Sequence, residues 1–206
     1  MGIPVLILGE SGTGKSASMR NFTPDQVGVF NVGAKPFPFR SRLNKVDTDD
    51  YRVIMGGLSK MKTRSAVIDD AQYLMANEYM RRCKENGYQK FTDIATNFWN
   101  LVQYVIRELP SDRIVYFIAH VERDQEGREK CKTIGKMLDD KITVEGLFTI
   151  VLKTHVQDGV YTFVTQNNGS DTVKSPMGMF DKLEIDNDLA MVDAVIREYY
   201  GLEAAA

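Results

Sequence analysis

The chain has 206 residues, of which 43% are hydrophobic and 26% are charged, and its formal net charge is −2. These values are typical of a folded globular protein and exclude a disordered, collagen-like or disulfide-stapled chain. The two cysteines are too few for a disulfide framework, and no apolar run is long enough for a membrane span. We therefore expect one domain with no membrane association, located in the cytoplasm, and any nucleic-acid binding must come from a local patch.

The first 120 residues alternate between apolar runs and segments with helical spacing. The apolar runs predict strands over residues 3–8, 27–32, 65–69 and 113–119. The helical spacing predicts helices over residues 15–21, 49–61, 71–86 and 91–109. Segment 33–44 is expected to be irregular because two prolines interrupt it. This alternation predicts a mainly parallel α/β sheet flanked by helices.

The remainder of the chain has a different pattern. Residues 121–146 are polar, with a short helix expected around 134–140, and residues 121–141 contain six Lys or Arg against six Asp or Glu. Strands are expected over 147–155 and 160–166, joined as a hairpin, and a closing helix over 189–200. The hairpin should extend the parallel sheet with an antiparallel portion. The domain is expected to cover residues 1–201, and residues 202–206 are expected to be an appended tail.

A glycine-rich loop follows the first predicted strand. Residues 9–16 read GESGTGKS and match the pattern G-x-x-x-x-G-K-[ST] at every fixed position. Glycines let backbone amides face an anion, Lys15 can reach the β- and γ-phosphates, and the Ser16 hydroxyl is a ligand for Mg²⁺. The pattern predicts an ATP site formed by Gly9, Glu10, Ser11, Gly12, Thr13, Gly14, Lys15, Ser16 and Ala17.

Two carboxylates end the third predicted strand. Asp69 and Asp70 follow the apolar residues AVI, which is the arrangement of a Walker B motif when a phosphate loop precedes it. Asp69 is expected to hold Mg²⁺, and Asp70 to orient or deprotonate the attacking water. The alternative is that both residues cap the following helix, because Asp is a good N-cap. Glu10 is a weaker candidate for the water-activating group, and we favour its interpretation as a solvated loop residue.

His120 lies where the fourth predicted strand, VYFIA, meets a loop. In ATPases with an extra strand between the phosphate-loop and Walker B strands, this position often carries a polar sensor of the γ-phosphate. A histidine can serve because its ring donates hydrogen bonds. The alternative is a strand-end histidine whose ring is satisfied by the backbone.

A cationic segment follows the second predicted strand. Residues 35–45 read KPFPFRSRLNK and contain no acidic residue. Cations can follow a phosphate backbone while aromatic rings stack on bases. The candidate contacts to single-stranded DNA are Lys35, Phe37, Phe39, Arg40 and Arg42. We favour the alternative of a proline-stiffened loop whose phenylalanines pack on the core while its cations remain solvated.

Taken together, these motifs resemble the phage-encoded RecA-like P-loop ATPases of the Sak recombinase type, in the ASCE division. The resemblance extends from about residue 3 to residue 180, and the stretches that carry it are GESGTGKS, NVGAKPFPFR, AVIDDAQYL, VYFIAHVERDQEG and TVKSPMGMF. It implies a RecA-type core, Mg-dependent ATP hydrolysis, a homo-oligomer, and a role with single-stranded DNA or a single-strand annealing protein in phage recombination or replication in the bacterial cytoplasm. It also implies that Lys174 reaches the γ-phosphate of a neighbouring subunit, and the alternative is that Lys174 is a surface lysine without this role.

One departure from that family pattern affects the expected rate. RecA-type ATPases usually carry a catalytic glutamate just after the second strand, and here FNVGAKPFPF contains no carboxylate. Either Asp70 is the base, therefore, or hydrolysis is slow. Two other functions remain open, a nucleotide or small-molecule kinase that uses Arg81 and Arg82 in an acceptor pocket, and a nucleotide-gated loader with little turnover.

Overall fold

The computed structural model describes residues 1–202 of the chain. The strands are β1 (Ile3–Gly9), β2 (Val27–Asn31), β3 (Lys45–Asp47), β4 (Ser65–Asp69), β5 (Ile114–Arg123), β6 (Glu129–Cys131), β7 (Ile150–Gln157), β8 (Val160–Val164) and β9 (Glu184–Asp186). The α-helices are α1 (Tyr51–Lys60), α2 (Gln72–Arg81), α3 (Gln89–Glu108) and α4 (Leu189–Tyr199). Three short helical segments are η1 (Ser16–Asn21), η2 (Met137–Ile142) and η3 (Val144–Leu147).

The described strands form one sheet with the order β3-β2-β4-β5-β1-β7-β8-β9, and β6 pairs with β5. The pairs from β3 through β7 are parallel, whereas β7, β8 and β9 pair antiparallel. This confirms the mainly parallel sheet and its C-terminal antiparallel portion. It also places β5 between β1 and β4, so an extra strand separates the glycine-rich loop from the acidic strand.

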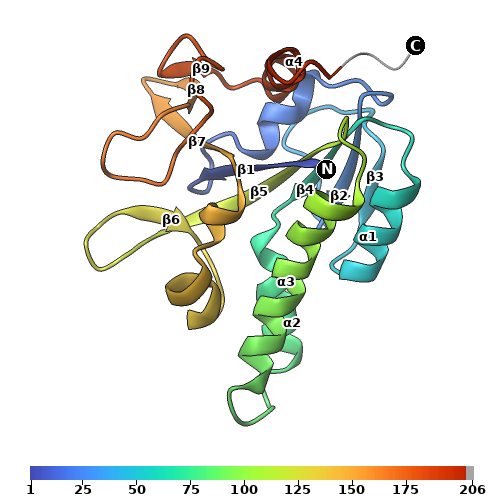
Figure 1. The fold of residues 1–206 in the computed structure, drawn as a ribbon, viewed down its shortest axis with the longest axis vertical. Coiled ribbons are helices and arrows are strands. Elements are labelled where there is room, and N and C mark those ends of the chain that lie inside the picture. The colour runs from blue at the N-terminus through green and yellow to red at the C-terminus, as the bar shows by residue number, and fades with distance from the viewer. Residues whose placement is uncertain (203–206) are drawn as a thin grey trace.

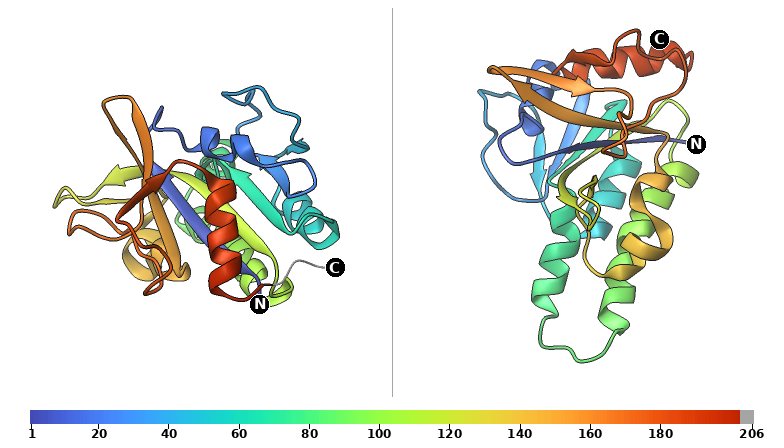
Figure 2. Two further views of the ribbon diagram at one scale, coloured as in Figure 1. Left: turned by 90° about the horizontal axis from the view of Figure 1, so that it is seen from above. Right: turned by 90° about the vertical axis from the view of Figure 1, so that its left-hand side faces the viewer.

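Helices cover both faces of the sheet (Figures 1 and 2). Successive side chains of a strand point to opposite faces. Leu6 and Leu8 of β1 accordingly pack in the core formed with α1, α2 and α3, whereas Val5 and Ile7 pack in the core formed with η1 and α4. Because both faces are buried, the central strands are apolar throughout, and polar residues occur where the strands end.

The strand register brings these polar ends together. Gly9 at the end of β1 pairs with His120 of β5, and Asn31 at the end of β2 pairs with Asp69 at the end of β4. Parallel strands have their carboxyl ends at the same edge of a sheet, so the loops that follow β1, β2 and β4 gather there. The apolar interior thus fixes where the polar residues lie.

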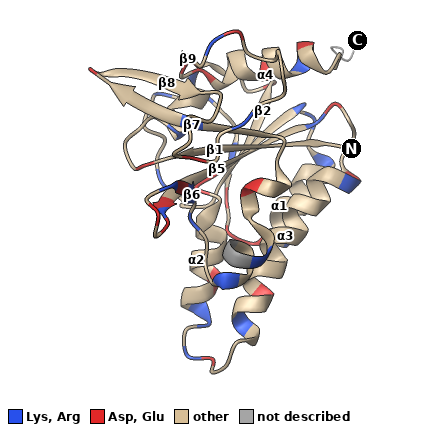
Figure 3. Ribbon diagram, turned by 60° about the vertical axis from the view of Figure 1, so that its left-hand side comes forward, with Lys and Arg blue, Asp and Glu red and all other residues tan. Residues whose placement is uncertain are grey.

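The structure corrects the expectation for residues 121–146. Strand β5 continues to Arg123, and the chain then turns back and pairs with it as the antiparallel strand β6. The sequence predicts a polar segment without strands here. A local turn explains the pairing, because the Asp124 carboxylate accepts the backbone amides of Glu126 and Arg128 and Gly127 adopts φ +81°. The helical segment near 134–140 occurs later, as the π-helical turn η2. Figure 3 shows acidic and basic residues side by side on the β5–β6 hairpin, and these include the ion pair of Arg123 with Glu129 at 3.1 Å.

Smaller differences have local causes. Helix α2 ends at Arg81 instead of residue 86. The carbonyls of Cys83 and Glu85 accept hydrogen bonds from the Lys90 ammonium of α3 in place of backbone amides of a continued helix. The helix expected over residues 15–21 is a six-residue 3₁₀ helix, η1, that begins at Ser16. Edge strands β3 and β9 were not expected, since a three-residue strand has too little pattern to detect. The hairpin of β7 and β8 is confirmed, with Asp158 and Gly159 both at positive φ.

Among the described helices, none has the length and apolar composition needed to cross a membrane. The predicted tail falls mostly on residues 203–206, which lie outside the described part of the chain.

Candidate functional site

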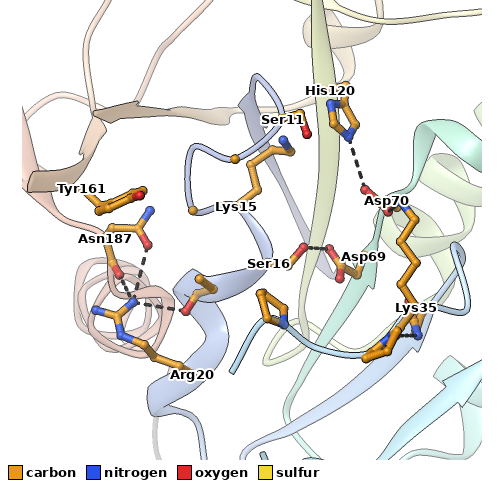
Figure 4. Close-up of a pocket in the computed structure, with 16 residues that line it drawn as sticks. Ser11, Lys15, Ser16, Arg20, Lys35, Asp69, Asp70, His120, Tyr161 and Asn187 are labelled. Carbon is orange, nitrogen blue, oxygen red and sulfur yellow. Dashed lines mark hydrogen bonds and ion pairs between the residues drawn. The ribbon is translucent and has the colours of Figure 1, made fainter. Parts of the chain in front are cut away.

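A cavity of about 660 Å³ lies at the edge of the sheet where β1, β2 and β4 end, and His120 faces it from within β5, which continues past the expected strand end to Arg123. Its volume is in the range of small-molecule sites. The walls come from three sources: the glycine-rich loop, the ends of the parallel strands with the loop after β2, and the antiparallel C-terminal region. Figure 4 shows Lys15 and Ser16 in the middle, the acidic residues on one side and Tyr161 with Asn187 on the other.

The glycine-rich loop encloses the middle of the cavity. Gly12 and Gly14 have φ values of +81° and +89°, which residues other than glycine rarely adopt. A Cβ atom at Gly14 would lie 2.9 Å from the Tyr161 ring, so glycine is also required there by packing. Lys15 is 5% exposed and its ammonium donates to the Glu10 carbonyl at 2.6 Å. Burial lowers the pKa of Lys15 to about 8.

Ser16 and Asp69 meet beside Lys15. The Ser16 hydroxyl donates to the Asp69 carboxylate at 2.8 Å, although 53 residues separate them in the chain. Asp69 is 5% exposed, and burial raises its pKa to about 6. A hydroxyl and a carboxylate are hard oxygen ligands, and Mg²⁺ is usually bound by one or two carboxylates together with substrate phosphates. These two residues therefore fit Mg²⁺.

Asp70 is held by two side chains at the acidic end of the cavity. Its carboxylate lies 2.9 Å from the Lys35 ammonium and 3.5 Å from His120 Nε2. Burial acts to raise its pKa, but the hydrogen bonds from His120 and Lys35 outweigh it and lower the pKa of Asp70 below its ordinary value. Asp70 also has a φ of +60°, so the backbone leaves the strand in a strained turn that aims the side chain at the cavity.

The alternative of helix capping is wrong for these carboxylates. Ala71 occupies the N-cap position of α2, and no side chain caps that end of the helix. The alternative for His120 does not hold either, because its ring faces Asp70, and an edge of the ring meets Tyr73 with the centroids 6.2 Å apart. The Asp70 carboxylate and the His120 ring therefore both line the cavity, where a ligand can reach them.

The opposite end of the cavity is formed by residues that the sequence analysis did not identify. Arg20 donates to the backbone carbonyls of Ala17 and Asn187 at 3.1 and 2.6 Å. Asn187 is 3% exposed, and within the described residues its Nδ2 has no hydrogen-bond partner. Its backbone amide donates to the Tyr161 carbonyl at 3.3 Å, so Tyr161 and Asn187 form one wall. No local motif marks these residues.

The candidate DNA contacts are distributed over different environments. Lys35 enters the cavity. Phe37 and Phe39 stack on each other with centroids 5.3 Å apart and pack against the core on the α4 face. Arg40 and Arg42 are exposed. This is the arrangement of the alternative that we favoured, except for Lys35, whose cation is used at the cavity.

The remaining candidates lie outside the cavity. Lys174 pairs through its backbone with Val151 of β7. The Glu10 carboxylate is 63% exposed and lies 3.8 Å from Arg123. Arg81 pairs with Asp49 at 2.5 Å. Arg82 pairs with three acidic side chains: Glu78, Glu85 and Asp93.

The sequence was also compared with known proteins. No family model matches it, and no curated protein matches it significantly.

Proposed function

We propose that this protein binds Mg-ATP in the cavity and hydrolyses it, as an ATPase of the RecA-like P-loop type. The observation that carries the proposal is the contact of Ser16 with Asp69 beside the buried Lys15. A phosphate-binding lysine, a hydroxyl and a carboxylate thus converge from two segments that a P-loop ATPase uses for the same ligand. The placement of β5 between β1 and β4 supports the same assignment.

The two ends of the cavity give the nucleotide a direction. The acidic end, with Asp69, Asp70 and His120, suits the terminal phosphate and its metal. The other end suits the base and sugar, because Tyr161 offers an aromatic face and Asn187 an unpartnered buried donor. Lys15, between the two ends, would contact the β- and γ-phosphates.

The residues of the acidic end suit hydrolysis. Bound Mg²⁺ would neutralise charge that develops on the phosphate oxygens. Asp70 accepts a hydrogen bond from the attacking water and orients it toward the γ-phosphorus, and its lowered pKa makes orientation its main role. The bond from the γ-phosphorus to the ADP oxygen breaks as the bond to the water oxygen forms, and a proton of that water passes to a phosphate oxygen, which yields ADP and inorganic phosphate. His120 donates to the γ-phosphate oxygens or to Asp70.

The wider role follows the resemblance. We propose that the ATPase acts as a homo-oligomer in phage DNA recombination or replication, with single-stranded DNA or a single-strand annealing protein. The exposed Arg40 and Arg42 are the candidate DNA contacts that remain on the surface.

The test is to measure ATP binding, phosphate release and particle size for the purified protein, with and without single-stranded DNA. Binding, release of phosphate without an acceptor, and ATP-dependent assembly are expected. Absence of ATP binding by the folded protein would contradict the nucleotide site. Transfer of phosphate to a small molecule in place of water would favour the kinase alternative, for which Arg81 and Arg82 are already engaged with acidic side chains.

Two observations favour a nucleotide-gated loader as the second candidate. Asp70 is paired with both Lys35 and His120, and the segment FNVGAKPFPF at the end of β2 contains no carboxylate, whereas RecA-type ATPases usually carry a glutamate just after this strand. Both features reduce the capacity to activate water. Tight ATP binding with negligible phosphate release, with and without DNA, would select this candidate over the ATPase.

A further inference from the structure

Lys35 reaches the cavity from a turn with a fixed backbone. Asn31, which is 2% exposed, donates from Nδ2 to the Lys35 carbonyl at 2.8 Å and to the Asp47 carboxylate at 2.7 Å. Ala34 within the turn has a φ of +50°. A Cβ atom on Gly33 would lie 3.0 Å from the Asp70 carboxylate and 3.3 Å from Lys35 Cε, so a larger residue would require these side chains to shift by a few tenths of an ångström.

In contrast to its backbone, the side chain of Lys35 is loosely held. Its ammonium contacts Asp70 at 2.9 Å and lies 4.9 Å from the centroid of the Tyr73 ring, and the side chain is 61% exposed. The Asp70 side chain is only 12% exposed, but the ammonium remains open to water, which screens and weakens the ion pair. An ammonium has three donors and a flexible stem, so it can change partners at little cost.

The other lysine and the arginine of the cavity lie away from its acidic end (Figure 4). Lys15 is buried in the glycine-rich loop, and Arg20 holds two backbone carbonyls at the opposite end. Among the described residues that line the cavity, Lys35 is therefore the lysine or arginine at the acidic end, where a terminal phosphate would bring its charge.

We propose that Lys35 contacts the γ-phosphate of ATP within its own subunit, and that it does so by exchanging its ion pair with Asp70 for the phosphate. The inference rests on the proposed nucleotide site. A phosphate carries more negative charge than one carboxylate and accepts several hydrogen bonds, so it competes well for the ammonium. The exchange frees one oxygen of Asp70 to accept a hydrogen bond from water, while His120 still holds the other.

The proposal distinguishes ATP from ADP. ADP has no γ-phosphate, so Lys35 stays on Asp70 and gains nothing when ADP binds. Lys35 thus gives the site its preference for the triphosphate and couples the arrival of the γ-phosphate to the release of the water-orienting carboxylate. The exchange also gives Lys35 of the same subunit a contact with the γ-phosphate that the resemblance assigns to Lys174 of a neighbouring subunit.

The test measures the affinities of ATP and ADP for wild type, Lys35→Ala and Lys45→Ala by competition against a fluorescent ADP at saturating Mg²⁺. Lys45 is the control, because it is the first residue of β3 and pairs with Asp47 outside the cavity, and it touches Lys35 only at its backbone carbonyl, 3.4 Å away. We expect Lys35→Ala to weaken ATP binding about tenfold, the typical value of a charge-assisted hydrogen bond less the lost ion pair, with ADP binding changed less than about twofold. Lys45→Ala should match wild type for both nucleotides.

A second pair of measurements separates direct contact from an effect through Asp70. In the Asp70→Asn background, direct contact predicts that Lys35→Ala still weakens ATP binding, whereas an effect exerted only through Asp70 predicts no further loss. Lys35→Arg keeps the charge and is expected to retain the preference for ATP.

The outcomes also separate this inference from the proposed function. Equal losses for ATP and ADP, or no loss, in a folded Lys35→Ala protein would overturn the inference alone, provided that wild type binds both nucleotides and Lys15→Ala does not. If wild type binds neither nucleotide, both the nucleotide site and the role of Lys35 are wrong.

Discussion

The two ends of the cavity belong to regions of different architecture. The acidic end is formed by the parallel strands and the loops that follow them, which supply Asp69, Asp70 and His120. The opposite end is formed by the antiparallel region, with Tyr161 on β8 and Asn187 before α4. The first region had recognisable motifs, and the second had none.

The difference teaches where function can be recognised in a sequence. A central parallel strand is apolar to its end, so the first polar residue after it stands out and lies at the shared edge of the sheet. Tyr161 lies in a strand that is partly exposed, where an aromatic residue is unremarkable. It reaches the cavity only because the hairpin of β7 and β8 brings it over the glycine-rich loop.

The largest loss of Mg-ATP affinity should come from changing Lys15, which lies between the two ends of the cavity. Lys15→Ala removes the cation that would face the β- and γ-phosphates, and we expect Mg-ATP affinity to fall about a thousandfold, the value of two charge-assisted hydrogen bonds. Isothermal titration measures it, with the exposed Lys62→Ala as control. Unchanged affinity in the folded variant would show that the nucleotide phosphates do not lie at Lys15, so the two ends of the cavity would not have the roles proposed for them.

The next largest effect is on turnover, and it concerns Lys174, which does not line the cavity of its own subunit. If Lys174 acts on a neighbouring subunit, Lys174→Ala should lose about a thousandfold in turnover, as trans-acting cations do in other P-loop enzymes. Mixing it with Lys15→Ala subunits should then restore part of the phosphate release. The corresponding mixture of Lys35→Ala with Lys15→Ala should release no more phosphate than the Lys35→Ala subunits alone, because both residues serve the same cavity. Co-assembly without recovery in the first mixture would count against the trans role.

At the acidic end, binding and hydrolysis should be separable. Asp70→Asn is expected to keep nucleotide affinity and slow phosphate release about a hundredfold, because a water-orienting group acts mainly in the transition state. Asp69→Asn is expected to impair Mg-dependent binding itself. Single-turnover hydrolysis with parallel binding titrations distinguishes the two. A wild-type rate for Asp70→Asn would show that another group orients the water.

At the opposite end, losses should be moderate and equal for the two nucleotides. Tyr161→Ala removes an aromatic face and Asn187→Leu an unpartnered donor, and each should weaken ATP and ADP by about tenfold without changing their ratio. Tyr88→Ala, at the exposed turn between α2 and α3, is the control. A change in the ratio would mean that this end contacts phosphate and not the base.

The smallest effect is a pH dependence of affinity. Lys15 has a pKa of about 8, so above that pH it loses the charge that attracts phosphate, and affinity should fall. Asp69 has a pKa of about 6, so below that pH its protonated form no longer holds Mg²⁺, and affinity should fall again. We expect a several-fold decrease half a unit to one unit beyond each value. Asp69→Asn should lose the acid limb and Lys15→Ala the alkaline limb, whereas a profile that is flat from pH 5 to 9 in wild type would contradict both assignments.

The sequence by itself determined the mainly parallel sheet, its antiparallel extension and the residues of the glycine-rich loop and acidic strand. Each of these depends on a local pattern, such as the apolar run before Asp69 or the spacing in GESGTGKS, that holds whatever the rest of the chain does. The contact of Ser16 with Asp69, the pairing of Lys35 with Asp70, and the wall of Tyr161 and Asn187 depended on tertiary structure. These residues are far apart in the chain or lie on loops, and only the order and register of the strands decide which of them meet.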